Sequence, residues 1–446
     1  MDNVGGEGRG DTSSIRQVAT ASFIGTAIEW YDFFLYGTAA ALLFPELFFP
    51  EFSETAGILL AFSTYSVGFA ARPIGGIVFG HYGDRIGRKS MLILSLLIMG
   101  IATALIGFLP TFESIGILAP LLLVVLRFCQ GIGVGGEWGG AVLMAVEHAP
   151  EGRRGFYGSW PQMGVPAGLL TGTVAFLIAN SFDVAWAWRV PFLLSLALVA
   201  VGLFIRLRIM ESPAFAQVKE SNTEANMPIV DVFRTYPKQV LLAMGMRLAE
   251  NGTFYVLTVF VLSYVVEELG KPESVGLTGV IIAAAIGIFT VPFFGALSDR
   301  FGRRPLYLFG SIFSLLFAFP FFWLLNTGVE PLIWLAIILG VNVGHDSMYG
   351  PQAAFFAELF GTRVRYSGAS VGYQLASVLG GGLSPLIAAA LLAKYDYGAV
   401  AAYTAGMAVI TVISTFLATE TYQGDIYETQ EAERRLISER TGERPA

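Results

Sequence analysis

The sequence GHYGDRIGRKSML at residues 80–92 occurs a second time, with substitutions, as GALSDRFGRRPLY at residues 295–307. Each copy is short and charged, and each lies between two long apolar runs. A repeat of this kind predicts that the two halves of the chain share one architecture. The positions that the copies share are Gly80, Asp84, Arg85, Gly87 and Arg88 in the first and Gly295, Asp299, Arg300, Gly302 and Arg303 in the second.

The apolar runs around these copies predict an all-α polytopic membrane protein. Of the 446 residues, 54% are hydrophobic and only 14% are charged, whereas a soluble domain carries about 25% charged residues. A helix of about 20 apolar residues crosses a hydrocarbon core of about 30 Å. Such runs, separated by charged, proline and glycine breaks, predict twelve spans, six in each half. Their expected limits are 18–44, 56–81, 91–109, 118–147, 155–180, 189–207, 237–266, 275–297, 305–325, 330–357, 366–393 and 399–418.

Basic residues orient these spans, because the cytoplasmic loops of membrane proteins carry an excess of lysine and arginine. With the N-terminus inside, only Arg189, Lys271 and Lys394 of the 27 basic residues fall in external segments. We therefore expect both termini in the cytoplasm of a multi-pass protein of the cell membrane. The expected parts are an N-terminal tail (1–17), a six-helix bundle (18–207), a central cytoplasmic loop (208–236), a second six-helix bundle (237–418) and a C-terminal tail (419–446).

The repeated pattern G-x-x-x-D-R-x-G-R-[KR] resembles the signature of the major facilitator superfamily. Further stretches resemble its metabolite:proton symporter family, whose members carry shikimate, 2-oxoglutarate, citrate, proline or betaine. The resemblance covers about residues 18–420, is nearest to the shikimate-transporter branch, and implies two six-helix bundles around a central substrate site. The stretches that carry it are IEWYDFFLYG, FAARPIGGIVFGHYGDRIGRK, RFCQGIGVGGEWGGA and WAWRVPFLLS in the first half, and MRLAENGTFYVLTVFVLSY, VNVGHDSMYGPQ and RYSGASVGYQLASVLGGG in the second.

Two acidic residues lie near the middle of the first expected span. Glu29, Asp32 and Tyr36 are spaced i, i+3 and i+7, which places them on one face of a helix. An acidic side chain at this depth costs about 2.5–3.5 kcal/mol on insertion scales, so we expect a function beyond contact between helices. Burial and a second carboxylate both disfavour the charged form, and one of the pair could therefore bind a proton near neutral pH. His345 is a further candidate for proton relay, or alternatively a hydrogen-bonded packing residue.

Three arginines within the spans are candidates for holding an anionic substrate. Arg127 leads, because a planar guanidinium grips a carboxylate with two hydrogen bonds; alternatively it forms an ion pair with an acid of the first helix. Arg72 and Arg247 are the others, although Arg247 could simply neutralise Glu250, which occupies the place in the second half that Glu29 has in the first. Further candidate substrate contacts are Tyr36, Gln130, Glu137, Trp138, Gln162, Glu250, Asn251, Tyr255, Tyr349, Tyr373 and Gln374.

The family resemblance also implies that charges of the repeated loops latch the two halves together on the cytoplasmic side. The segments VEHAPEGRRGFYGS (146–159) and AELFGTRVRYSGAS (357–370) align and contribute further charges. Alternatively, the basic loops only set the orientation, but an acid such as Asp84 does not serve that purpose. The expected gate residues are Asp84, Arg85, Arg88, Glu147, Arg154, Asp299, Arg300, Arg303, Glu358 and Arg365.

These features predict a proton-coupled symporter that imports a small organic acid, such as a shikimate-like compound, a keto or hydroxy acid, or an aromatic carboxylate. The alternatives are an uncoupled facilitator, a proton-driven exporter, or a symporter for a zwitterion such as betaine or proline. Neither H-E-x-x-H nor G-x-x-x-x-G-K-[ST] occurs, so neither a zinc protease nor an ATP-driven pump is expected. We expect a monomer in a lipid bilayer whose partners are a small-molecule substrate and protons, with no cofactor, metal or nucleic acid.

Overall fold

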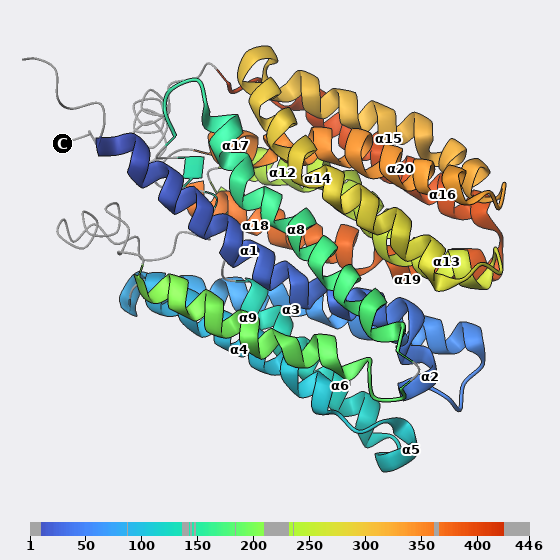
Figure 1. Ribbon diagram of the computed structural model, residues 1–446. Helices are drawn as coiled ribbons and strands as arrows, with labels where there is room; N and C mark the ends of the chain where they lie inside the picture. Colours follow the sequence, from blue (N-terminus) through green and yellow to red (C-terminus); the bar gives the residue numbers. More distant parts are fainter. Residues whose placement is uncertain are drawn as a thin grey trace, which may run out of the picture.

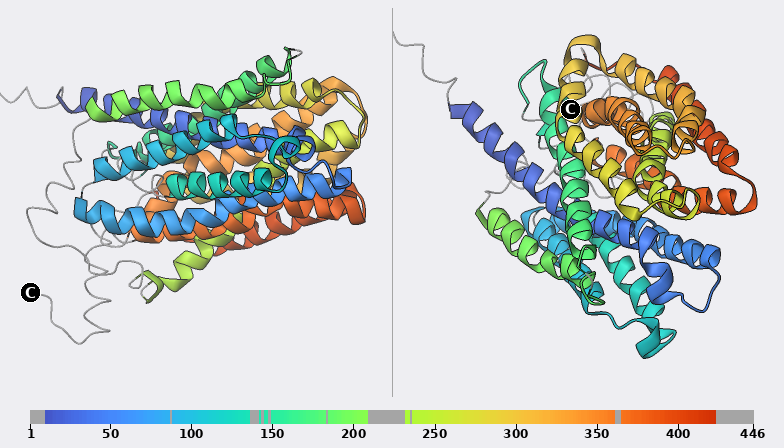
Figure 2. Two further views of the ribbon diagram at one scale, coloured as in Figure 1. Left: turned by 90° about the horizontal axis from the view of Figure 1, so that it is seen from below. Right: turned by 45° about the vertical axis from the view of Figure 1, so that its right-hand side comes forward.

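The computed structural model describes residues 10–86, 88–135, 142, 145–146, 149–182, 184–208, 232–234, 236–360 and 365–422. Within these residues every regular element is a helix, and the long helices lie roughly side by side along one direction (Figure 1, Figure 2). The helices of the first half are α1 (Gly10–Leu42), α2 (Phe44–Phe48), α3 (Glu54–Ile86), α4 (Arg88–Phe108), α5 (Phe112–Ile115), α6 (Leu118–Gly135), α8 (Arg154–Asn180) and α9 (Arg189–Arg208).

The second half contains three π-helical segments as well as α-helices. A π-helical segment is rare, and it frequently marks a functional site. The elements of this half are α12 (Pro237–Tyr255), η1 (Val256–Phe260), α13 (Val261–Glu267), α14 (Glu273–Phe301), α15 (Arg303–Leu325), α16 (Glu330–Ile338), η2 (Leu339–His345), α17 (Asp346–Glu358), α18 (Arg365–Ser377), η3 (Val378–Gly382), α19 (Ser384–Lys394) and α20 (Tyr397–Leu417).

Each of the twelve expected spans coincides with a described helix or with consecutive helices. Eight of these stretches are long and apolar enough to cross a membrane, and the other four correspond to α1, α3, α4 and α9. Some helices exceed the expected spans, because a helix does not have to end where its apolar run ends: α1 begins at Gly10 and α3 continues to Ile86. By contrast, α6 is described only to Gly135, so most of the rest of the expected span 118–147 lies outside the described residues.

Burial separates central helices from those that face the surroundings. In the stretch Pro237–Glu267 (α12, η1 and α13), 94% of the most apolar window is buried, against 33% in both α14 and α15. Phe289 of α14 and Leu316 of α15 are 74% and 70% exposed. Large apolar side chains at the periphery suit a protein whose outer surface contacts lipid.

Small residues allow α3 and α6 to approach closely. A Cβ atom on Gly131 would lie 2.1 Å from the carbonyl oxygen of Gly68, and one on Gly135 would lie 2.0 Å from that of Arg72. Small residues of this kind are enriched where membrane helices pack closely. This close contact places the buried arginines of α3 and α6 on adjacent helices.

The second copy of the repeated loop forms a sharp turn between α14 and α15. Gly302 has φ +100°, a conformation that residues with a Cβ atom rarely adopt. The side chain of Glu420 accepts hydrogen bonds from the backbone N–H groups of Arg303 and Arg304, both at 3.0 Å. A carboxylate is stabilising at this place, because the N-terminus of a helix carries unpaired N–H groups and a partial positive charge.

The helix α8 joins the two halves. It packs on α1 within the first half, and on α14 and α17 of the second. In the right-hand view of Figure 2, the green helix α8 lies where the blue helices of the first half meet the yellow and orange helices of the second.

Candidate functional site

A narrow cavity lies between the two halves, near the middle of the bundle. Helices of both halves contribute to its wall, so a molecule held there would contact both. Five of the candidate substrate contacts and one of the proton-coupling candidates lie in this wall. The lining residues are Thr26, Glu29, Trp30, Arg72, Val134, Val142, Pro161, Gln162, Tyr349, Tyr373 and Gln374.

Arg72 brings a buried positive charge to this wall. The residue is 1% exposed, and its Cζ lies 4.2 Å from the ring centroids of both Phe33 and Phe69 and 5.2 Å from that of Trp30. Among the described residues, Nε and Nη2 have no hydrogen-bond partner, and no carboxylate lies within ion-pair distance. Cation–π contacts offset only part of the cost of burying such a charge. The guanidinium can therefore bind a carboxylate through two N–H groups.

Arg127 is also buried, but it does not line the cavity. Its Nη1 donates to Oε1 of Gln130 at 3.0 Å, and its Cζ lies 4.2, 4.1 and 4.7 Å from the rings of Phe33, Tyr36 and Tyr65. Within the described part of the chain, Nε and Nη2 lack partners here too. The expected ion pair with an acid of the first helix is not formed. The leading candidate for anion binding thus lies behind Phe33, whose ring is 4.2 Å from both arginines.

The two acids of α1 point to different surroundings. Glu29 is 5% exposed and lines the cavity. Asp32 is 1% exposed and lies inside the first bundle, where the hydroxyl of Ser195 donates to its Oδ1 and Thr103 is a second neighbour. Its Oδ2 has no hydrogen-bond partner among the described residues. The i, i+3 spacing therefore does not bring the two carboxyl groups to one site, since the helix directs Asp32 towards α9.

Tyr36 and Gln130 lie away from the cavity as well. The hydroxyl of Tyr36 donates to Oγ1 of Thr64 at 2.7 Å, and Nε2 of Gln130 donates to Oγ1 of Thr103 at 2.7 Å. Gln130 thus connects Arg127 to the surroundings of Asp32. These residues can transmit a change between charges inside the first bundle, but they do not contact a molecule in the cavity.

In the second half, Arg247 belongs to a fully paired group. Its Nη1 donates to Oε2 of Glu250 and to Oε1 of Gln352, both at 2.8 Å, and its Nε donates to Ser377 at 3.1 Å. Its Cζ lies 3.2 Å from the ring centroid of Tyr373, which lines the cavity. The expected alternative for this pair, mutual neutralisation of Arg247 and Glu250, is what the geometry shows.

His345 lies between two carboxyl groups. Its Nε2 is 3.1 Å from Oε1 of Glu250, and its Nδ1 is 2.9 Å from Oδ1 of Asp346. The ring stacks between Phe254 and Tyr349, with centroid distances of 4.3 and 4.9 Å. The histidine is therefore a hydrogen-bonded packing residue that contacts two acids, and its role in proton relay stays a prediction.

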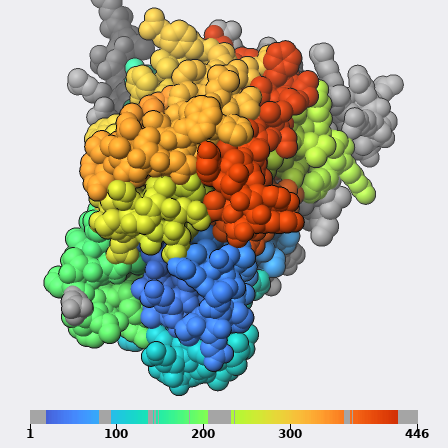
Figure 3. Space-filling model, turned by 90° about the vertical axis from the view of Figure 1, so that its right-hand side faces the viewer, coloured from blue at the N-terminus to red at the C-terminus, as the bar shows by residue number. Residues whose placement is uncertain are grey.

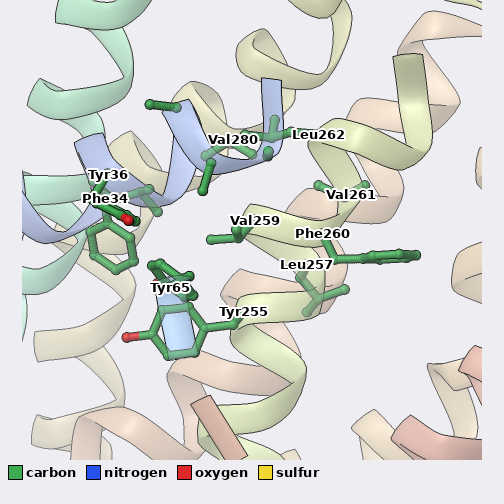
Figure 4. Close-up of a cluster of buried hydrophobic side chains, with 14 of the residues drawn as sticks. Phe34, Tyr36, Tyr65, Tyr255, Leu257, Val259, Phe260, Val261, Leu262 and Val280 are labelled. Carbon is green, nitrogen blue, oxygen red and sulfur yellow. The ribbon is translucent and has the colours of Figure 1, made fainter. Parts of the chain in front are cut away.

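Two further candidates lie near the cavity without lining it. Asn251 is 4% exposed, and its Oδ1 has no partner among the described residues. Tyr255 belongs to an aromatic cluster with Phe34, Tyr65 and Phe69, at centroid distances of 6.0, 6.0 and 5.1 Å. Figure 4 shows Tyr255 facing Tyr65 across the two halves. These rings bring α1 and α3 of the first half into contact with α12 of the second.

The two halves also touch at the end of the molecule that lies beyond this cluster. Nδ2 of Asn180, at the end of α8, donates to Oε1 of Glu273, at the start of α14, at 3.1 Å. In Figure 3 the blue surface of the first half lies directly against the yellow and red surfaces of the second. We expect this end to face outwards, because the repeated basic loops lie at the other end.

At the opposite end, Asp299 of α14 joins the halves. It accepts hydrogen bonds from the backbone N–H groups of Gly155 and Phe156, at 2.8 and 2.9 Å, at the start of α8. Arg303 donates to Oδ1 of Asp299 at 2.7 Å and to Oε1 of Glu358 at 3.2 Å. A Cβ atom on Gly155 would lie 2.4 Å from the carbonyl oxygen of Gly295, so the two helices cross in close contact there.

Of the other expected gate residues, the structure describes the side chains of Arg154 and Arg300. Arg154 is the first residue of α8, and exposed Arg300 lies near the ring of Phe301, at 5.4 Å. The remaining gate and substrate candidates have side chains outside the described part of the structure; these are Asp84, Arg85, Arg88, Glu137, Trp138, Glu147 and Arg365.

Several contacts of the site carry no signal in the sequence. Ser195 reaches Asp32 across 163 positions, and Gln352 reaches Glu250 across 102. Trp30 also lines the cavity and is the next residue after Glu29 in the sequence. The position of Trp30 beside the candidate Glu29 is therefore a signal in the sequence. Ser195 and Gln352 have no such signal, because their contacts form only when helices distant in sequence pack together.

Two helical halves that meet around a cavity with charged and amide side chains in its wall are typical of secondary transporters. Residues 22–380 match the model of a family described as Major Facilitator Superfamily. The chain belongs to the major facilitator superfamily.

Relatives agree with this assignment along nearly the whole chain. The shikimate transporter of Escherichia coli (strain K12) is 43% identical over 422 residues, 92% of this chain and 96% of the relative. The inner membrane metabolite transport protein YhjE of the same strain is 42% identical and covers 92% and 95%. The proline/betaine transporter of this strain is 36% identical and covers 86% and 79%.

A solved structure shares the fold. The proton:xylose symporter XylE bound to 6-bromo-6-deoxy-D-glucose superimposes with a TM-score of 0.74, at 19% identity, over 95% of this chain and 99% of that one. With its apolar helices and relatives, this chain is a multi-pass transport protein of the cytoplasmic membrane and not an enzyme. The predicted all-α membrane fold and the family are thereby confirmed, whereas the cytoplasmic placement of both termini stays a prediction.

Proposed function

We propose that this chain is a proton-coupled symporter that imports a small organic acid by alternating access. The observation that carries the proposal is the guanidinium of Arg72, which is buried in the cavity wall without a carboxylate partner among the described residues. A substrate carboxylate would supply the missing negative charge and hydrogen-bond acceptors. The relatives that carry shikimate or metabolites support a small polar anion as the substrate.

In this proposal the cavity offers different groups to the rest of the substrate. Gln162, Tyr349, Tyr373 and Gln374 present amide and hydroxyl groups near the charge, and these suit the hydroxyl groups of a cyclic hydroxy acid. Trp30 provides an aromatic surface for a flat or partly unsaturated ring. The Arg127 side chain stays behind Phe33 and acts on the substrate only through the field of its charge.

Asp32 would carry the coupled proton. It is buried away from the cavity, next to Ser195, and has an oxygen without a hydrogen-bond partner among the described residues. An ionised carboxylate is costly in such surroundings, so protonation and movement of the first bundle would be linked. Glu29, in the cavity wall, would sense the substrate charge more directly.

A zwitterionic substrate is a second candidate, and one observation favours it. The cavity wall holds Arg72 and Glu29 together with Trp30. Arg72 could bind the carboxylate of betaine or proline, while Trp30 and Glu29 attract the cationic nitrogen. The proline/betaine relative is in keeping with this arrangement.

Uptake by purified protein in liposomes tests the proposal. The panel contains labelled shikimate, 2-oxoglutarate, citrate, proline and glycine betaine, each with and without a pH gradient that is acidic outside. We expect accumulation of one carboxylate above its external concentration, only with the gradient. Equilibration without accumulation would indicate an uncoupled facilitator, and efflux driven by the gradient would indicate an exporter.

A further inference from the structure

The contact of His345 with two acids fixes a minimum number of protons. A carboxylate only accepts hydrogen bonds, and a neutral imidazole has a single N–H group. Both ring nitrogens lie within hydrogen-bond distance of a carboxyl oxygen, at 3.1 and 2.9 Å. If the three groups shared only one proton, one of the two contacts would place a nitrogen lone pair against a carboxylate lone pair, with no hydrogen between them. Glu250, His345 and Asp346 must therefore hold two protons together in this arrangement.

The remaining hydrogen bonds place these protons on the histidine. Oε2 of Glu250 accepts from Arg247 at 2.8 Å and from Gln352 at 2.9 Å. Oδ2 of Asp346 accepts from Asn342 at 2.9 Å and from Thr290. Each acid is thus surrounded by donors, as an ionised carboxylate requires.

The charges also balance only when these three groups hold two protons, and the hydrogen bonds above place both on the histidine. Arg247 and the imidazolium carry two positive charges, and Glu250 and Asp346 carry two negative ones. Loss of the proton would leave one uncompensated negative charge in a place where all four side chains are at most 4% exposed. Burying such a charge is costly.

Among the described residues, no other charge faces the imidazole and changes this balance. From α14 the hydroxyl of Thr290 donates to Asp346, and from α15 the hydroxyl of Tyr307 accepts from Gln352. From α17 Tyr349 stacks on the ring. The only titratable residue of α16 is Glu330, at its first position.

The group is connected to the cavity through two side chains. Tyr349 stacks on His345, lines the cavity, and accepts a hydrogen bond on its carbonyl oxygen from Gln162 of α8 at 3.0 Å. Tyr373 lies against Arg247 and also lines the cavity. The π-helical segment η2 ends at His345, where a small change in backbone geometry would move the ring.

We infer that Glu250, His345 and Asp346 form a second proton-binding site, whose proton stabilises the closed arrangement of the second half around the cavity. The site is separate from Asp32, which the proposed function uses for coupling. The inference rests on the proposed function only in experiments that measure transport; the protonation state of the site does not depend on it.

The protonation state can be measured without transport. The chain has three histidines, so His81→Gln and His148→Gln leave His345 as the single imidazole of the full chain. After ¹⁵N-histidine labelling and reconstitution into lipid nanodiscs, nitrogen NMR at pH 7.5 should show two protonated ring nitrogens. In the same background, Asp346→Asn removes one negative charge and should leave only one. A single protonated nitrogen before that substitution, with no infrared band of a carboxylic acid that Asp346→Asn removes, would overturn the inference.

Exchange of labelled shikimate across liposomes at equal pH on both sides gives a second readout. The rate should fall on the alkaline side, because the closed state then loses its proton, and Asp346→Asn should abolish this pH dependence. An unchanged pH profile in Asp346→Asn contradicts the inference. A missing effect of a pH gradient in the parent protein contradicts the proposed coupling instead, so the two failures are distinguishable.

Discussion

In the first half, Arg72 and Arg127 lie against aromatic rings and have no carboxylate within ion-pair distance among the described residues. In the second half, Arg247 contacts Glu250, Gln352 and Ser377. The aligned acids also differ in their places: Glu29 lines the cavity, whereas Glu250 does not and contacts Arg247, His345 and Gln352. One half thus leaves a positive charge available to a ligand, and the other keeps its charges paired.

The difference predicts opposite effects on stability. Arg247→Met would leave Glu250 in a group with excess negative charge, and breaking a buried pair in this way typically costs about 3–5 kcal/mol. Arg72→Met removes a charge that has no carboxylate partner and should change stability little or raise it. The free energy of unfolding in mixed micelles of a mild detergent and SDS measures both. Equal destabilisation by the two variants would break the comparison.

The same difference predicts which arginine matters for binding. Arg72→Lys keeps the charge but loses the paired N–H groups, so affinity for the transported carboxylate should fall by about 10- to 150-fold, equivalent to about 1.5–3 kcal/mol. Arg127→Lys is the matched control, because that side chain is equally buried but lies outside the cavity. Calorimetric titration with shikimate measures both. A larger loss in the control would return the leading role to Arg127.

The gate extends the comparison to the repeated loops, of which only the second-half copy has described side chains. Asp299→Asn weakens the contact with the start of α8, which can exist only while that end is closed. A loss of about 1–3 kcal/mol shifts the population of open molecules about five- to 150-fold. In a Cys129→Ser background, a reporter cysteine at Thr26 should react faster with a reagent added from the cytoplasmic side.

Asp396→Asn is the control for the gate. Asp396 also accepts from a helix N-terminus, at Ala399 of α20, but this contact lies within the second half. If labelling increases equally in both variants, loss of any helix cap is enough to raise the reactivity of the reporter cysteine. The hypothesis that Asp299 latches the two halves would then be wrong.

The last prediction concerns the accumulation of substrate that the coupled proton drives. Each pH unit supplies about 1.4 kcal/mol per proton, which gives about tenfold accumulation per unit for one proton. Asp32→Asn should abolish this accumulation and preserve exchange, because the side chain lies outside the cavity. Glu29→Gln, in the cavity wall, should reduce exchange as well. Undiminished accumulation in Asp32→Asn would exclude this residue as the carrier.

The fold could be predicted because its signals are local. Apolar run lengths, basic loops and the repeated motif at Asp84 and Asp299 each occupy a few tens of residues, and the lipid environment leaves the helix as the natural way to satisfy the backbone there. The burial of charged residues such as Arg72 and Asp32 inside the bundle also follows from their places within apolar runs. The one-face rule, however, placed Glu29 and Asp32 together, and tertiary contacts separated them.

The contacts between side chains of the site could not be predicted from spacing within single helices. Whether Arg127 or Arg72 faces the cavity depends on how α3 and α6 rotate about their glycine contact, which no spacing within one helix defines. The link from Glu250 to His345 joins residues 95 positions apart. Such contacts require the packing of helices that the sequence keeps separate.

A structure of the full chain with its bound carboxylate, by electron cryo-microscopy in nanodiscs, tests the central claim most directly. Shikimate is the first ligand, or the solute that the uptake panel selects in its place. We predict the carboxylate against Nε and Nη2 of Arg72, with Arg247 still paired to Glu250. A carboxylate bound to Arg247 with Glu250 displaced, or to Arg127 with Phe33 turned aside, would contradict the account.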